Sequence, residues 1–109
     1  MFGRKKNREE QLGTAFDRIY NYNYSNEKSI DEQFLELADI LINNRPLVIN
    51  FEEVNNTVEI NRAEAFLSGV SYALNGEVHR LGRETFLFAT EGCLKDGTLR
   101  YYLNDVARD

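Results

Sequence analysis

Hydrophobic and polar residues alternate with period two in the segment TAFDRIYNYNY (Thr14–Tyr24). Its aromatic residues all fall on even positions, whereas Asp17, Asn21 and Asn23 fall on odd positions. Because this alternation is combined with residues that favour extended backbone, it predicts a β-strand.

A helical period follows this segment. Ser29 and Glu32 match the S-x-x-E capping box at a helix start. The apolar residues behind them recur every three or four positions and form one face: Ile30, Phe34, Leu37 and Leu41. We expect the helix to end near Asn43–Asn44, before Arg45-Pro46. The short apolar run LVINF (Leu47–Phe51) then predicts a buried strand.

A second helix is predicted from about Thr57 to Leu74, with Asn56 and Glu59 as its capping residues. Its apolar arc is wider than one stripe, and one extra row consists of Phe66, Gly69 and Ala73. A glycine inside a helix costs about 1 kcal/mol relative to alanine, and close approach of another backbone is a reason to keep it. The pattern leaves two partners open for Gly69, the rest of its own chain or a second subunit.

A hairpin is predicted after this helix. Asn75-Gly76 ends the helix, with Gly76 suited to a left-handed cap. The segments Glu77–Leu81 and Thr85–Thr90 read as two strands joined by a tight turn at Gly82. Both faces of the second strand are apolar, so it is covered on both sides or one face awaits a partner.

The remaining residues complete the predicted domain. Glu91–Gly97 is expected to form a loop, Thr98–Leu103 a last strand, and residues 104–109 a frayed end or a short helix. The order β-α-β-α-β-β-(β) predicts an α+β fold (an α/β sandwich) with two helices on a mixed sheet of about five strands. We expect one domain over residues 14–109, preceded by a flexible basic head at 1–13.

Charge separates the head from the body. The chain carries −5, but residues 1–10 are net +2, so the other 99 residues carry −7. An acidic body argues against nucleic acid as a partner, because phosphate binding needs a basic footprint. The basic start is either a lipid contact, an acidic-partner contact or a solvated end. With one cysteine and no apolar run near ~20 residues, nothing indicates secretion or a membrane span, and we expect a cytoplasmic protein.

No catalytic constellation stands out. His79 is the only histidine and has no cysteine at metal-ligand spacing, and Cys93 has no candidate base nearby in sequence. We therefore expect no enzyme activity, no metal and no cofactor. A protein-binding module remains, with Arg80 beside Phe86 and Phe88 as candidate peptide-binding residues. The alternative is that both phenylalanines belong to the core.

The run FLSGVSYALNGEVHRLGRETFLF (Phe66–Phe88) resembles the signature stretch of the SepF cell-division family. That pattern has F-L-S-G, a helix end Y-A-(I/L)-x-G, a hairpin strand with a basic residue, an (I/L)-G turn and an F-L strand. NNRPLVIN (Asn43–Asn50) is similar to the preceding part of the family pattern. The resemblance covers roughly residues 31–90.

The resemblance implies a dimeric cytoplasmic adaptor that binds the C-terminal peptide of the tubulin-like protein FtsZ and tethers it to the membrane at the division site. It implies a role in self-association for Gly69, beside Phe66 and Ala73. It implies a peptide groove that uses Arg80 and Phe86.

The chain departs from this family pattern in three respects, one of which is a small insertion in the stretch Glu52–Ile60. Ala65 stands where the family has aspartate before F-L-S-G, and the usual amphipathic helix and long linker are replaced by MFGRKKN. The candidate membrane contacts there are Met1, Phe2, Arg4, Lys5 and Lys6. Contact through them would be weak, since each basic residue adds only about 1 kcal/mol near an anionic surface. The alternatives are a self-assembling scaffold without FtsZ or membrane binding, and a small ligand-binding or regulatory domain.

Overall fold

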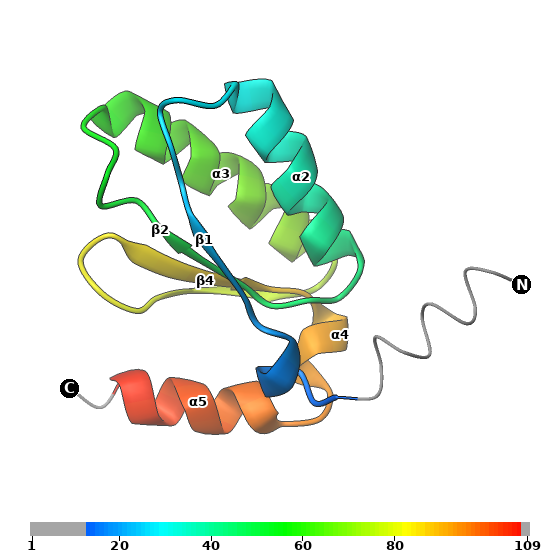
Figure 1. Ribbon diagram of the computed structural model, residues 1–109. Coiled ribbons are helices and arrows are strands. Elements are labelled where there is room, and N and C mark those ends of the chain that lie inside the picture. The colour runs from blue at the N-terminus through cyan, green and yellow to red at the C-terminus, as the bar shows by residue number, and fades with distance from the viewer. Residues whose placement is uncertain (1–12, 108–109) are drawn as a thin grey trace, which may run out of the picture.

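The computed structural model describes residues 13–107, which form an α+β domain, as predicted (Figure 1). In chain order its elements are η1 Phe16–Arg18, β1 Tyr20–Asn23, α2 Ile30–Ile42, β2 Leu47–Asn50, α3 Thr57–Ala73, β3 Glu77–Arg80, β4 Thr85–Ala89, α4 Glu91–Leu94 and α5 Thr98–Ala107.

The sheet has four strands in the order β1-β2-β4-β3. β1 runs parallel to β2, whereas β4 is antiparallel to both β2 and β3. Helices α2 and α3 cover one face of this sheet, and α5 lies against the other face (Figure 1). β2 and β4 are therefore the central strands. β3 is an edge strand and forms a hairpin with β4.

Both long helices begin at the capping residues that the sequence indicates. The Ser29 side chain accepts a hydrogen bond from the Glu32 N–H at 3.4 Å. The Asn56 side chain accepts from the Val58 N–H at 3.0 Å and from the Glu59 N–H at 3.2 Å. Each cap satisfies backbone donors that the first helical turn leaves unpaired.

The end of α3 differs from the prediction. The left-handed residue is Asn75, with φ of 58°, and not Gly76. Gly76 is required for close approach instead, because a Cβ atom there would overlap the carbonyl of Ala89 on β4. Asparagine tolerates the left-handed conformation, so the cap and the close contact use two adjacent residues.

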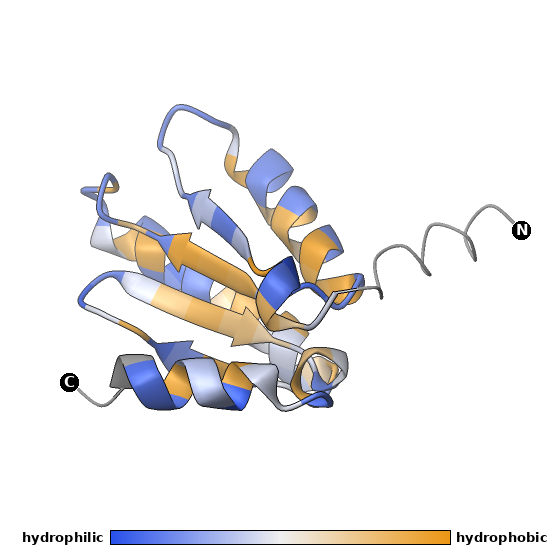
Figure 2. Ribbon diagram, turned by 60° about the horizontal axis from the view of Figure 1, so that its bottom comes forward, coloured by the Kyte–Doolittle hydropathy of each residue, from blue (hydrophilic) through white to orange (hydrophobic). Residues whose placement is uncertain are grey.

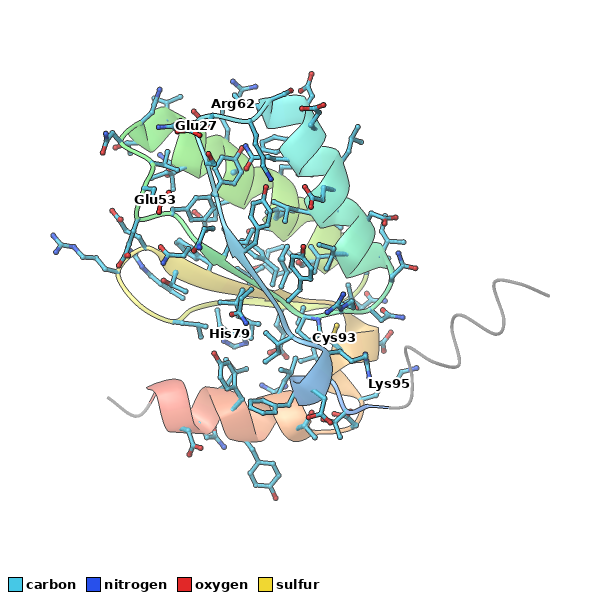
Figure 3. The ribbon with its side chains drawn as sticks, in the orientation of Figure 1. Glu27, Glu53, Arg62, His79, Cys93 and Lys95 are labelled. Atoms are coloured by element: carbon cyan, nitrogen blue, oxygen red, sulfur yellow. The ribbon has the colours of Figure 1, made fainter. Side chains whose placement is uncertain are left out.

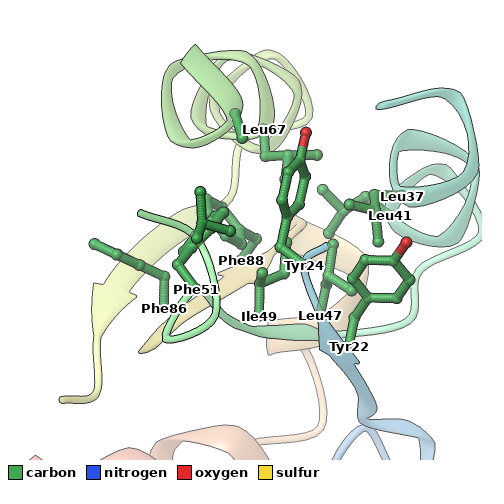
Figure 4. Packing of buried hydrophobic residues seen from close by; sticks show 12 residues of the cluster. Tyr22, Tyr24, Leu37, Leu41, Leu47, Ile49, Phe51, Leu67, Phe86 and Phe88 are labelled. Atoms are coloured by element: carbon green, nitrogen blue, oxygen red, sulfur yellow. The ribbon is translucent and has the colours of Figure 1, made fainter. Parts of the chain in front are cut away.

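The main core fills the space between the sheet and helices α2 and α3 (Figure 4). Ile49 and Phe88 of the sheet and Leu37 and Leu67 of the helices are fully buried there. Removing such a side chain from water stabilises the fold by about 1.5–3 kcal/mol. Figure 2 shows the matching pattern, with hydrophobic central strands and helices that alternate between hydrophobic and hydrophilic faces.

The opposite face of β4 is also covered. Leu87 and Val48 pack against Leu103 of α5. Of the two options for the apolar strand, the structure therefore has the one in which both sides are covered within the chain.

The strand predicted for Thr98–Leu103 is wrong. Thr98–Ala107 forms the single helix α5, which includes the start of the segment expected to be a frayed end or a short helix, and the sheet has four strands and not five. The buried residues Leu99 and Leu103 are four positions apart, which is a helical spacing. The expected loop at Glu91–Gly97 contains the short helix α4.

The first predicted strand is shorter than expected. Only Tyr20–Asn23 pairs in the sheet, and Phe16–Arg18 forms a 3-10 turn. Thr14 and Asp17 cause this change. The Thr14 N–H donates to the Asp17 carboxylate and the Asp17 N–H donates to the Thr14 hydroxyl, both at 3.2 Å. Such local side-chain bonds compete with the strand ladder.

Candidate functional site

A surface groove with a volume of about 270 Å³ lies between the first half of α3 and the β3–β4 hairpin. α3 contributes four lining residues and the hairpin another four: Thr57, Ile60, Asn61 and Glu64, and Arg80, Arg83, Glu84 and Phe86. The groove therefore brings together two of the three residues predicted to bind a peptide.

Arg80 is held in place by its own hairpin. Its Nε donates to the carbonyl of Gly82 at 3.1 Å, and its Nη2 donates to the carbonyl of Arg83. The guanidinium carbon lies 5.4 Å from the ring centroid of Phe86, within the range of a cation–π contact. The Arg80 side chain is thus ordered before any ligand arrives, which lowers the entropy that binding costs.

Phe86 forms an apolar wall of the groove and Phe88 supports it from behind. Phe86 is 9% exposed and Phe88 is fully buried. The ring of Phe86 packs edge-on against Phe51 at 5.9 Å and stacks with Phe88 at 6.3 Å. Figure 4 shows Phe86 at the outer end of this row of rings. Phe88 does not line the groove, and its contacts position Phe86.

Sequence reasoning did not identify the α3 side of the groove. Ile60, Asn61 and Glu64 lie at helical spacings of one, three and four, so they share one face. The sequence contains that spacing and also predicts the hairpin, but it does not show that the hairpin lies opposite this face of the helix. Glu64 and Glu84 line the groove together with Arg80 and Arg83, so the groove mixes both signs of charge around an apolar wall.

The residues predicted for self-association lie on the outer surface of α3. Gly69 and Ala73 are exposed, and a Cβ atom on Gly69 would meet nothing within 4 Å. Phe66 is 37% exposed and stacks on Phe34 of α2, with ring centroids 4.7 Å apart. Packing within the chain therefore does not require a glycine at 69, which removes one of the two explanations for it.

His79 and Cys93, both labelled in Figure 3, each contact a side chain of the same domain. His79 Nε2 lies 2.7 Å from Glu77 Oε1, and Arg100 of α5 donates to both oxygens of the same carboxylate at 3.2 and 2.9 Å. The hydrogen bond from Arg100, followed by the one with His79, lowers the pKa of Glu77. Cys93 is fully buried, with its sulfur 3.3 Å from Thr90 Oγ1.

Residues 13–107 contain neither a metal-binding cluster nor a helix that could cross a membrane. No group of three or more His, Cys, Asp or Glu side chains in this part is arranged to hold a metal ion. No helix there is both long and apolar enough to span a membrane. The candidate membrane contacts Met1, Phe2, Arg4, Lys5 and Lys6 lie outside the described residues.

A small α+β domain with an apolar, charge-lined groove and an exposed row of small residues on a helix has the features of a protein-interaction domain. A family model described as "Cell division protein SepF" matches residues 28–93, which is more than half of the chain. The chain belongs to the SepF family of cell division proteins.

Curated relatives agree with this assignment. The chain is 38% identical over 90 residues to a cell division protein SepF of Lactobacillus helveticus, with 78% of this chain and 59% of that protein covered. It is also 38% identical over 64 residues to a cell division protein SepF of Oceanobacillus iheyensis, with 59% of this chain and 44% of that protein covered. The chain thus spans about half the length of the curated relatives it matches.

Proposed function

We propose that the protein is a non-catalytic cell-division adaptor that binds the C-terminal peptide of an FtsZ-like filament protein and associates with further copies of itself. The observation that carries the proposal is the ordered guanidinium of Arg80 stacked on Phe86 inside the groove. An apolar wall beside a fixed positive charge suits a short peptide with an apolar centre and an acidic flank.

The outer surface of α3 supports the self-association part of the proposal. Gly69 and Ala73 present almost no side chain, so a second helix can approach this surface closely. Phe66 and the 59% exposed ring of Tyr72 flank these small residues and supply apolar area. We expect a homodimer or a higher oligomer built through this surface.

Titration of a fluorescent FtsZ tail peptide against the full chain tests the groove. Arg80→Ala removes a charged contact and should weaken binding by about 1–3 kcal/mol, or roughly 5- to 150-fold. Lys95→Ala is the matched control, because Lys95 is an exposed cation on the short segment after α4, outside the groove. Unchanged folding of both variants should be checked by thermal unfolding.

Two results would count against peptide binding in the groove. One is no saturable binding of the tail peptide by the unaltered chain. The other is equal loss of affinity in the Arg80 and Lys95 variants, which would indicate a nonspecific charge effect. If the chain still assembles but binds no peptide, the function reduces to a self-assembling scaffold of the same family.

Contact with a membrane at the division site is the third part of the proposal. Met1, Phe2, Arg4, Lys5 and Lys6 would supply weak attraction to anionic lipid, and assembly would multiply it. Co-sedimentation of the full chain with vesicles containing anionic lipid should exceed that with neutral vesicles. Replacing Arg4, Lys5 and Lys6 by glutamine should remove the difference, and retention of the difference would reject this contact.

A further inference from the structure

A second cavity lies between η1 and α5, away from the peptide groove. Its volume is about 380 Å³. Its lining comes from two segments that are more than 80 residues apart in the sequence: Thr14 and Phe16, and Thr98, Tyr101, Tyr102 and Asp105. The four residues of α5 lie at spacings of three, four and seven, so they form one face of that helix.

Hydrogen bonds fix the two walls of this cavity relative to each other. The Phe16 N–H donates to Thr98 Oγ1 at 3.0 Å. Asp96 accepts from the Ala15 N–H at 2.8 Å and from the Thr98 N–H at 3.0 Å. These backbone hydrogen bonds also lower the pKa of Asp96. The cavity is therefore formed without a ligand.

The lining combines aromatic rings with a carboxylate. Phe16 and Tyr102 lie with ring centroids 5.6 Å apart, tilted by 54°. Phe16 is 50% exposed and Tyr101 is 78% exposed, which is unusual for large rings. Aromatic ring faces attract cations, and the attraction is stronger where the contact is shielded from water. With Asp105 beside them, the rings suit the side chain of lysine or arginine.

Arg18 and Arg100 are nearer in the sequence, but Arg18 donates to the carbonyls of Gly13 and Asn44, and Arg100 donates to the Glu77 carboxylate. Another source is the basic segment Arg4–Arg8, which holds Arg4, Lys5, Lys6 and Arg8. Thr14, the first residue of the cavity wall, follows Arg8 by six positions. Six residues of extended chain reach about 20 Å, enough to bring a basic side chain to the cavity. The body carries −7 against +2 for residues 1–10, so the charges are complementary.

We propose that the cavity between η1 and α5 binds a basic side chain of the chain's own segment Arg4–Arg8. A ligand joined by so short a linker has an effective concentration in the millimolar range, so weak contacts suffice. While bound, that charge is withheld from other anionic surfaces. Binding in the cavity and contact with anionic lipid would therefore compete for the same residues, whether or not the FtsZ proposal holds.

Paramagnetic relaxation in the full chain tests the proposal. A nitroxide on Gly3→Cys leaves all four basic residues in place, and Cys93 is fully buried and protected from the reagent. We expect broadening of the amide signals of Tyr101 and Asp105. In the double variant Tyr101→Ala, Asp105→Asn, most of the broadening of amide signals along α5 should be lost. Both side chains are exposed, so the fold should tolerate the change.

A control variant removes a large exposed side chain and an exposed carboxylate elsewhere in the domain. Leu35→Ala with Asp39→Asn alters an exposed apolar residue and an exposed carboxylate on α2, and should leave the broadening on α5 intact. Equal broadening of α5 in the cavity variant and in the unaltered chain would overturn the proposal. So would broadening that arises only when a spin-labelled copy is mixed with a separate isotope-labelled copy, because the occupant would then be a second molecule.

Discussion

Replacing Gly69 by alanine should stabilise the single chain. The position is exposed in the interior of α3, and the added Cβ would meet nothing within 4 Å. Alanine is favoured over glycine in a helix interior by about 1 kcal/mol. For a domain of this size, that gain should raise the melting temperature by roughly 4–8 °C.

The same substitution should weaken self-association if α3 is the contact surface. Two added methyl groups, one from each copy, would separate helices that approach each other at Gly69. Overpacking of a close contact typically costs about 1–3 kcal/mol, which corresponds to roughly a 5- to 150-fold higher dissociation constant. Stability of the single chain and strength of association are thus expected to change in opposite directions.

Urea unfolding at low protein concentration measures the first effect, and sedimentation over a concentration series measures the second. Asp39→Ala on α2 is the control, because it also raises helix propensity at an exposed position but does not touch α3. A stabilised Gly69→Ala chain that associates as strongly as the unaltered chain would refute the contact at Gly69. A destabilised one would show that the outward placement of this residue is wrong.

Three further predictions concern the fold. Gly76→Ala should destabilise by about 1–3 kcal/mol or more in urea unfolding, because its Cβ would overlap a β4 carbonyl, whereas Gly82→Ala, with open space around it, should change little. Tyr24→Phe should be neutral or stabilising in the same assay, because the buried Tyr24 hydroxyl has no partner among the described residues; a loss of about 1 kcal/mol or more would reveal one. Folding lowers the pKa of Glu77 from its ordinary value of 4.5, so the ionised carboxylate stabilises the fold at a pH above 4.5. This stabilisation is lost as the pH falls through the lowered pKa. Glu77→Gln should therefore reduce the stability difference between pH 7 and pH 3, and an unchanged difference would contradict this assignment.

Local signals were sufficient where an element begins with a specific side chain. Ser29 and Asn56 act as the predicted caps, and the buried strand Leu47–Asn50 follows from its apolar run. The strand predicted for Thr98–Leu103 is wrong, because these six residues alone favour a strand, whereas the polar residues after them continue a helix to Ala107. A helix is recognised from apolar residues three and four positions apart, which takes several turns to establish. In a segment as short as Thr98–Leu103, the strand preference of the two tyrosines outweighs that signal.

The candidate groove was predictable only in part. The hairpin register places Arg80 opposite Phe86, and alternation along two strands is enough to suggest that pair. The α3 wall depends on how far the helix lies from the hairpin, which the sequence pattern does not contain. Phe88 shows the same limit, because strand parity puts it beside Phe86 but does not reveal that α2 and α3 cover it completely.

Helix α3 carries both proposed surfaces, on different sides. At about 100° per residue, the groove residues Thr57, Ile60, Asn61 and Glu64 centre about 160° from the row formed by Phe66, Gly69 and Ala73. A partner helix on that row would therefore leave the groove open, and each added copy would add one more groove to the assembly. A filament presents its tails repeatedly, so an assembly with several grooves can bind it far more tightly than one groove binds one tail. On this geometry, weak peptide binding by a single chain and firm attachment to a filament are compatible.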